Sequence, residues 1–263
     1  MAVAWTLASV AVISIVSLAG ALGLSFGLLK RHRVMMFLIA MAAGTLFGDA
    51  FLQLLPEATH DGYKAQTGWH VIFGLMAMFA VEAILHRGHS HAEHLDEHAH
   101  GHVKPFGWIN LVGDALHNFL DGVIIAAAYL IDTAAGLATT IAVAAHEIPQ
   151  ELGDFAVLVR SGMPVKKALL LNFGSALFAL LGAGIVLSIN VSVASLEAVA
   201  LPLIAGAFIY IAAADLIPEL HHHSGRKDMA VIVAGLLLGL LLMGALLDLE
   251  SVLFADSDHG HNH

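Results

Sequence analysis

Residues 106–131 read FGWINLVGDALHNFLDGVIIAAAYLI, and residues 134–159 read AAGLATTIAVAAHEIPQELGDFAVLV. Each run is long enough to cross a bilayer, which takes about 20 mostly apolar residues. Both runs nevertheless contain ionisable side chains, which cost a few kcal/mol each at bilayer depth and therefore need a reason to be there. The pair is predicted to form two membrane helices that face a polar site.

Six further apolar runs lie outside this pair. The chain is 59% hydrophobic and 12% charged, with a mean hydropathy of +0.83, which excludes a soluble globular protein. We therefore expect an all-α polytopic membrane protein with eight transmembrane helices in a single domain, residues 1–263. The six further runs are 3–29, 34–56, 68–85, 164–189, 195–220 and 229–249.

Charge and cysteine content narrow the chemistry. The formal net charge of −10 excludes a nucleic-acid partner, because a phosphate backbone requires a basic surface. The chain has no cysteine, so disulfides and thiolate ligands are excluded. A transition metal would have to be held by imidazole, carboxylate and amide groups.

The distribution of lysine and arginine predicts the orientation, since these residues gather in cytoplasmic loops. With both termini outside, ten of the eleven basic residues fall in inner loops, and Lys64 falls outside. We expect a multi-pass protein of the plasma or inner membrane. The ten inner residues are Lys30, Arg31, Arg33, Arg87, Lys104, Arg160, Lys166, Lys167, Arg226 and Lys227.

A short internal similarity suggests an inverted repeat. The second run contains Ala43-Gly44 and Leu54-Leu55-Pro56-Glu57, and the seventh contains Ala205-Gly206 and Leu216-Ile217-Pro218-Glu219 at an offset of 162. In the predicted topology these helices cross in opposite directions, as an inverted repeat requires. The first three helices would then match the last three around a central pair, a 3+2+3 arrangement. Chance similarity between Ala-, Gly- and Leu-rich helices is the alternative.

Three histidine-rich tracts lie outside the apolar runs. They are predicted to be flexible, low-affinity binders of divalent metal, and the alternative is that they are solvated segments without a specific role. The first is a cytoplasmic loop, 86–104, and the third is the C-terminal tail, 250–263. Their histidines are His86, His89, His91, His94, His98, His100 and His102; His221, His222 and His223; and His259, His261 and His263.

The two central helices offer a mixed nitrogen and oxygen ligand set. His117 with Asp121, and His146 with Gln150, are each one helical turn apart, so four ligands can converge between facing helices. Such a set suits zinc and its divalent neighbours. A buried hydrogen-bond network that only holds helices together is the alternative. The other polar residues are Asn110, Asp114 and Asn118 on one run, and Glu147, Glu151 and Asp154 on the other.

Two polar stripes predict paths to and from this site. Asp49, Gln53 and Glu57 follow each other at four-residue spacing toward the outer face, whereas Asp215 and Glu219 lie one turn apart near the inner face. The alternative is that such end-of-helix residues reach into the interface without lining a path.

The strings His117-Asn118-Phe119-Leu120-Asp121-Gly122 and His146-Glu147-Ile148-Pro149-Gln150-Glu151-Leu152-Gly153-Asp154 resemble the signature helices of the ZIP family of divalent metal transporters. The resemblance extends over essentially the whole chain. It implies the 3+2+3 inverted repeat, a homodimer, and movement of zinc or related metals, such as iron, manganese or cadmium, into the cytosol, with no enzymatic activity and no catalytic cofactor.

The resemblance also implies roles for individual residues. The principal metal site falls on His117, Asp121, His146 and Gln150, with a neighbouring position on Asn118 and Glu147. Around them, Asp114, Glu151 and Asp154 are expected to support the ligands rather than bind the metal. The most similar branch of the family reads His-Glu-x-Pro-His-Glu, whereas this chain has Gln150 at the second His, a weaker neutral oxygen ligand.

Two other kinds of protein compete with a transporter. His146-Glu147 begins a His-Glu-x-x-His motif, as in zinc metallohydrolases, but Gln150 replaces the second histidine and Pro149 lies in the ligand-bearing turn. A membrane-bound metal sensor or buffer is the other alternative, because histidine-rich loops bind metal without transport.

Overall fold

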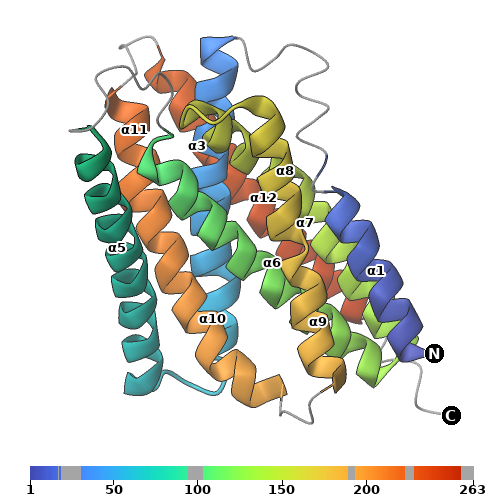
Figure 1. Cartoon of the computed structure of the whole chain (residues 1–263). Helices are drawn as coiled ribbons and strands as arrows, with labels where there is room; N and C mark the ends of the chain where they lie inside the picture. The colour runs from blue at the N-terminus through green and yellow to red at the C-terminus, as the bar shows by residue number, and fades with distance from the viewer. Residues whose placement is uncertain (17, 19–30, 94–102, 189–192, 223–227, 256–263) are drawn as a thin grey trace, which may run out of the picture.

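The structure is a computed structural model that describes residues 1–16, 18, 31–93, 103–188, 193–222 and 228–255. Within these ranges it is helical throughout and contains no strand (Figure 1). The predicted histidine-rich segments 94–102 and 256–263, together with His223, lie outside the described residues. The helices are α1 (Ala2–Val16), α3 (His32–Gly48), η3 (Asp49–Leu54), α4 (Leu55–Ala58), α5 (Ala65–Glu93), α6 (Pro105–Ile131), α7 (Thr133–Arg160), α8 (Val165–Ala176), α9 (Phe178–Ser188), α10 (Val193–Tyr210), η4 (Ile211–Leu216), α11 (Ile217–His222) and α12 (Met229–Ala255).

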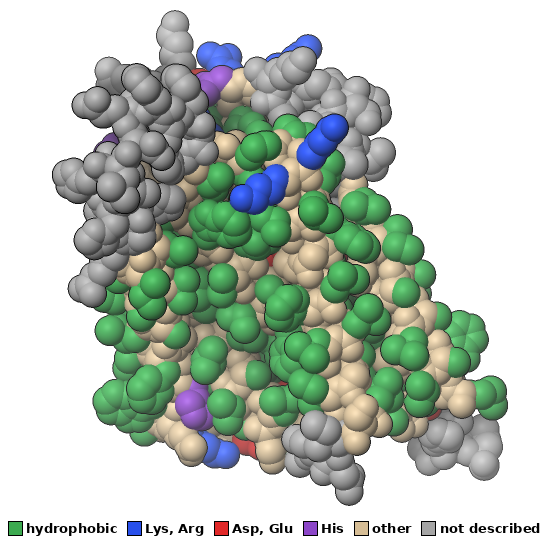
Figure 2. All heavy atoms as spheres, viewed as in Figure 1, with side chains coloured by type: hydrophobic (Ala, Val, Ile, Leu, Met, Phe, Trp, Pro, Cys, Tyr) green, Lys and Arg blue, Asp and Glu red, His purple; other side chains and the backbone are tan. Residues whose placement is uncertain are grey.

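Six helical segments of the described chain are long and apolar enough to cross a membrane. They confirm a multi-pass, all-helical protein, and hydrophobic side chains cover much of its outer surface (Figure 2). Eight spans were expected. The two that do not qualify are α1, whose described apolar stretch is short, and α7, whose polar residues make it less hydrophobic. The six are His32–Ala58, Ala65–Leu85, Pro105–Ile131, Val165–Ser188, Val193–His222 and Met229–Leu247.

Several helices extend past or break within the apolar runs. The backbone of α5 stays helical to Glu93 and that of α12 to Ala255, so the predicted loop at 86 and tail at 250 both begin inside helices. The reason is that hydropathy locates the end of an apolar run, whereas a helix continues as long as its backbone hydrogen bonds do. The run 164–189 divides into α8 and α9 at Leu177.

The internal similarity coincides with a shared backbone feature. A π-helical turn occupies Asp49–Leu54 between α3 and α4, and a second occupies Ile211–Leu216 between α10 and α11, at the same offset of 162. A proline that cannot donate a backbone hydrogen bond follows each turn, Pro56 in the first and Pro218 in the second. Figure 1 shows α3 and α10 running in opposite directions. Two distant segments thus share one local geometry.

Small residues bring the helices close together. A methyl group at Gly122 of α6 would overlap the carbonyl oxygen of Ala179 in α9, and one at Gly182 of α9 would overlap that of Phe119. Glycines at such positions let two helix backbones touch inside a bilayer. The close contact holds α6 against α9, while the polar face of α6 contacts α7, α8 and η3.

Apolar side chains form two main buried clusters. The larger joins α3, α10, η4 and α12 with parts of α6 and α7, and the smaller joins α1, α6, α7 and α9. The predicted central pair, α6 and α7, contributes to both clusters. These two helices therefore lie in the middle of the molecule, where their polar residues are shielded from lipid.

Candidate metal centre

The polar residues of α6 and α7 face inward, as their spacing predicted. The ten residues concerned are all buried, and none is more than 5% exposed. Spacings of three and four place each set along one face of its helix. They are Asn110, Asp114, His117, Asn118 and Asp121 on α6, and His146, Glu147, Gln150, Glu151 and Asp154 on α7.

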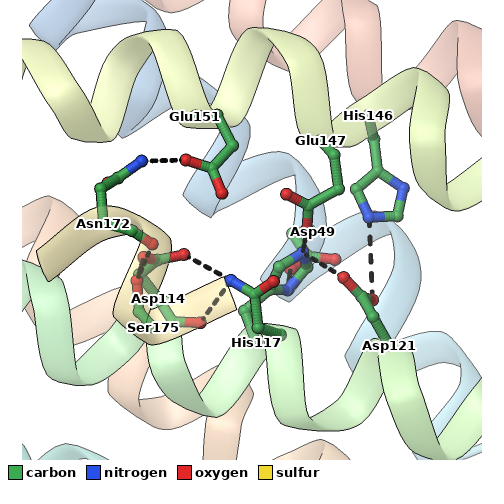
Figure 3. Close-up of polar contacts among 10 residues, drawn as sticks. Asp49, Asp114, His117, Asp121, His146, Glu147, Glu151, Asn172 and Ser175 are labelled. Atoms are coloured by element: carbon green, nitrogen blue, oxygen red, sulfur yellow. Dashed lines mark hydrogen bonds and ion pairs between the residues drawn. The ribbon is translucent and has the colours of Figure 1, made fainter. Parts of the chain in front are cut away.

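Four of these residues come together between the two helices. His117, Asp121, His146 and Glu147, hereafter the metal cluster, each offer one ligand atom, and these atoms lie within 4.8 Å of one another. The Nε2 atom of His117 lies 3.4 Å from Oδ2 of Asp121 and 3.7 Å from Oε1 of Glu147. The Nε2 atom of His146 lies 3.8 Å from Oδ1 of Asp121. Figure 3 shows the side chains converging from facing helices.

Four of the atoms that face one another in the metal cluster have no hydrogen-bond partner. This holds for Nε2 of both histidines, Oδ2 of Asp121 and Oε1 of Glu147, and all are buried. Leaving such an atom unsatisfied costs about 1–3 kcal/mol. A divalent cation accepts electron pairs from imidazole nitrogen and carboxylate oxygen together, so binding one would satisfy several of these atoms at once.

Asp49, which the sequence placed on the path to the site, contacts the metal cluster itself. Its Oδ2 atom is 3.2 Å from Nδ1 of His117, on the side of the ring opposite Nε2. A carboxylate on one ring nitrogen fixes the orientation of an imidazole whose other nitrogen binds metal. The π-helical turn that begins at Asp49 brings the residue here, which the spacing of the stripe did not reveal.

The two predicted amide ligands behave differently. The side-chain amide of Asn118 donates to Oδ1 of Asp114 at 2.8 Å and leaves its own buried oxygen without a partner. Gln150 is buried, at 3% exposed, one turn beyond His146 on α7. Its role as a ligand stays a prediction.

The three residues expected to support the ligands form a second group, hereafter the carboxylate cluster: Asp114, Glu151 and Asp154. Asn110 donates its amide to Asp154 at 3.0 Å. Two residues of α8 complete the group, because Asn172 hydrogen-bonds to Glu151 and Ser175 to Asp114 (Figure 3). Nothing in the sequence indicated that Asn172 and Ser175 would be the partners of these carboxylates.

The stripe formed by Asp49, Gln53 and Glu57 opens onto a cavity. Gln53 and Glu57 line a space of about 480 Å³ together with His60 and with Glu197 of α10. The sequence did not indicate that His60 and Glu197 would line this cavity, because His60 is in a short loop and Glu197 is in an otherwise apolar helix. Two of the four side chains are carboxylates and a third, His60, can bind metal through nitrogen. The cavity is therefore lined by groups that attract or bind cations.

Of the two residues predicted to line the inner path, Glu219 is paired within the protein, whereas one oxygen of Asp215 is buried without a hydrogen bond. Glu219 forms ion pairs with Lys104 at 3.2 Å and with Arg160 at 3.1 Å, which ties the start of α6 and the end of α7 to α11. Asp215, in η4, is 9% exposed. Glu219 thus connects α6, α7 and α11 through its two ion pairs. It lies at the end of the molecule where the inner path is predicted to open.

Comparisons with known proteins identify the family to which the chain is similar. A model of the family described as ZIP Zinc transporter matches residues 3–105 and 84–247. The zinc transporter zipt-7.2 of Caenorhabditis elegans is 32% identical over 264 residues, with 78% of this chain and 56% of the relative covered.

Two further relatives are also named as zinc transporters. ZIP13 of Pongo abelii is 35% identical over 198 residues, which cover 70% of this chain and 58% of the relative. ZIP4 of Homo sapiens is 31% identical over 253 residues, with 72% and 39% covered. The chain thus spans roughly half the length of these relatives. Since the family model covers most of its residues, the chain belongs to the ZIP zinc transporter family.

Proposed function

We propose that the protein moves divalent transition-metal cations, zinc foremost and related ions such as Fe²⁺, Mn²⁺ and Cd²⁺ with lower preference, across a membrane toward the cytosol. The metal passes through the site between α6 and α7. The observation that carries the proposal is the metal cluster, whose four buried ligand atoms face one another without hydrogen bonds.

The proposed path runs through the residues named from the sequence. Metal would be collected at the outer cavity by Gln53 and Glu57, and passed to His117, Asp121, His146 and Glu147, with Asn118 and Gln150 beside them. It would leave past Asp215 and Glu219. Carboxylates that face a cavity attract cations and raise their local concentration.

The proposed topology follows the basic residues and the repeat. The chain crosses the membrane eight times as a 3+2+3 inverted repeat, with both termini outside, in the plasma or inner membrane. The paired π-helical turns and the opposite directions of α3 and α10 support the repeat. We further propose that residues 1–263 act as one transporter domain, that loop 86–104 and tail 250–263 concentrate metal, and that the protein is a homodimer like other members of its family.

Metal flux into proteoliposomes tests the proposal and separates it from the alternatives. A sensor or buffer binds metal without moving it, and the family is named for transport rather than hydrolysis. The His117→Ala variant is expected to abolish zinc uptake while the protein still inserts, because ligands contribute more to passage than to membrane stability. His70→Ala on α5 is the matched control and should transport normally. Normal flux in His117→Ala would refute the site.

A further inference from the structure

A hydrophobic groove lies on the opposite side of α6 from the metal cluster. It encloses about 460 Å³ between α5, α6, α8 and α9. It opens on the surface, since Val112 is 38% and Phe178 is 45% exposed. Among the described lining residues, Ser175 is the one with a hydroxyl, amide or charged side chain, and its hydroxyl is used by Asp114.

The groove has the shape of a slot along one helix. Its wall on α6 runs from Trp108 to Leu116, which corresponds to about 12 Å of helix. On the facing helix, a methyl group added to Gly174 would meet no atom within 4 Å. An apolar slot of this length, open to the bilayer, accommodates a hydrocarbon chain and contains nothing that would hold water.

A basic edge borders the groove where α8 begins. The Nζ atom of Lys167 lies 4.9 Å above the ring of Trp108, a residue that also lines the groove. Lys166 is its exposed neighbour. The described ion pairs give neither lysine a carboxylate, whereas Lys104 and Arg160 are both paired with Glu219. In Figure 2 basic side chains stand above a broad hydrophobic face.

We propose that this groove binds an anionic phospholipid, with its headgroup at Lys166 and Lys167 and one acyl chain in the slot past Trp108. Lysines at the inner surface are attracted to anionic lipid headgroups. A second copy of the chain is a poorer occupant, because a symmetric contact through this face would bring the lysines of both copies together.

The bound lipid would hold in place a helix that contacts the residues around the metal centre. The groove is bounded by α8, and the same helix carries the Asn172 and Ser175 side chains that hold Glu151 and Asp114. An acyl chain between α5 and α8 fills the space that would otherwise let α8 shift away from α6. This inference rests on the placement of the protein in a membrane and not on metal transport.

Tryptophan quenching by brominated lipid tests the proposal directly. The chain has three tryptophans, so Trp5→Phe with Trp69→Phe leaves Trp108 as the single reporter in the groove. The protein is placed in phosphatidylcholine vesicles that contain a minor fraction of acyl-brominated phosphatidylglycerol or acyl-brominated phosphatidylcholine. We expect about fivefold stronger apparent binding of the anionic lipid, the gain from about one lysine near an anionic surface.

Two pairs of variants distinguish recognition of the lipid headgroup from binding of the acyl chain. Replacing both lysines, Lys166→Gln with Lys167→Gln, should remove the headgroup preference, whereas Lys64→Gln should leave it. Gly174→Leu fills the slot and should weaken quenching by both lipids. Gly184→Leu is the matched control, because that glycine also has no atom near its added methyl group but does not line the groove.

Three results would overturn the proposal. The first is equal quenching by the two headgroups, and the second is unchanged quenching in Gly174→Leu. The third is weak quenching that falls further as protein density rises, which would indicate that a second copy fills the groove. Native mass spectrometry of the unmodified chain gives the same headgroup comparison without the tryptophan replacements, and must show retained phosphatidylglycerol in preference to phosphatidylcholine.

Discussion

Two groups of buried polar side chains lie next to each other on α6 and α7, and they differ in how their atoms are satisfied. In the carboxylate cluster, Asp114, Glu151 and Asp154 each accept a hydrogen bond from a serine or asparagine. One oxygen each of Glu151 and Asp154 also has no hydrogen bond, but the metal cluster has four facing atoms without one: Nε2 of His117 and of His146, Oδ2 of Asp121 and Oε1 of Glu147. The hydrogen bonds from Asn110, Asn172 and Ser175 favour a structural role for the carboxylate cluster, and the four facing atoms without such bonds favour the proposed metal binding at the metal cluster.

The sharpest test exchanges one carboxylate for an amide in each cluster. Asp121→Asn removes a charge that a divalent cation needs and is expected to lower zinc uptake by more than about 100-fold, beyond the usual effect of residues behind a metal site. Asp154→Asn keeps the oxygen that accepts from Asn110 and should retain most uptake. Zinc flux in proteoliposomes at matched protein content measures both. Equal losses would remove the distinction between the clusters.

Asp49 is the residue that links the metal cluster to η3. Asp49→Asn removes the negative charge beside Nδ1 of His117, so the imidazole loses the partner that orients it. We expect a 10–100-fold loss of zinc affinity, the usual effect of such partners. Zinc competition binding to the purified protein measures it, with Asp61→Asn in the loop between α4 and α5 as the control. An unchanged affinity would mean that Asp49 serves the path alone.

The inward faces of α6 and α7 could be read from the sequence because the ligands recur every three or four residues along each helix. All ten polar residues on those faces are buried as expected. The partners supplied by other helices could not be read. Asn172, Ser175 and Asp49 reach the centre through the packing of α8 and η3 against α6 and α7, and helical periodicity carries no information about which helices pack together.

The exact ends of the helices also could not be predicted from the sequence. Apolar runs located the spans, but the break at Leu177 and the π-helical turns before Pro56 and Pro218 arise from backbone hydrogen bonds that hydropathy does not record. The offset of 162 between the two runs was visible in the sequence. Its structural meaning became visible only when both segments proved to carry the same turn.

Gln150 tests how far the metal cluster extends along α7. Imidazole favours zinc over manganese more strongly than an amide oxygen does. Gln150→His is therefore expected to tighten zinc binding about tenfold, which corresponds to about 1.4 kcal/mol, with little gain for manganese. Zinc and manganese competition in the original protein and the variant measures the change. If the preference does not move, Gln150 does not bind the metal, and the cluster ends at the other four residues.

The smallest effect is expected in the carboxylate cluster, where the hydroxyl of Ser175 can be removed without touching a ligand. In Ser175→Ala, Asp114 keeps the amide of Asn118 on Oδ1 but loses the donor on its other oxygen. Hydrogen bonds between membrane helices contribute modestly, so the free energy of unfolding should fall by about 1 kcal/mol. Thermal unfolding in detergent measures this loss, and zinc uptake per folded molecule should stay close to that of the original protein. Ser195→Ala on α10, outside the cluster, is the control for loss of a serine. A collapse of uptake with unchanged stability would reverse the assignment, because it would place Ser175 and Asp114 among the groups that handle the metal.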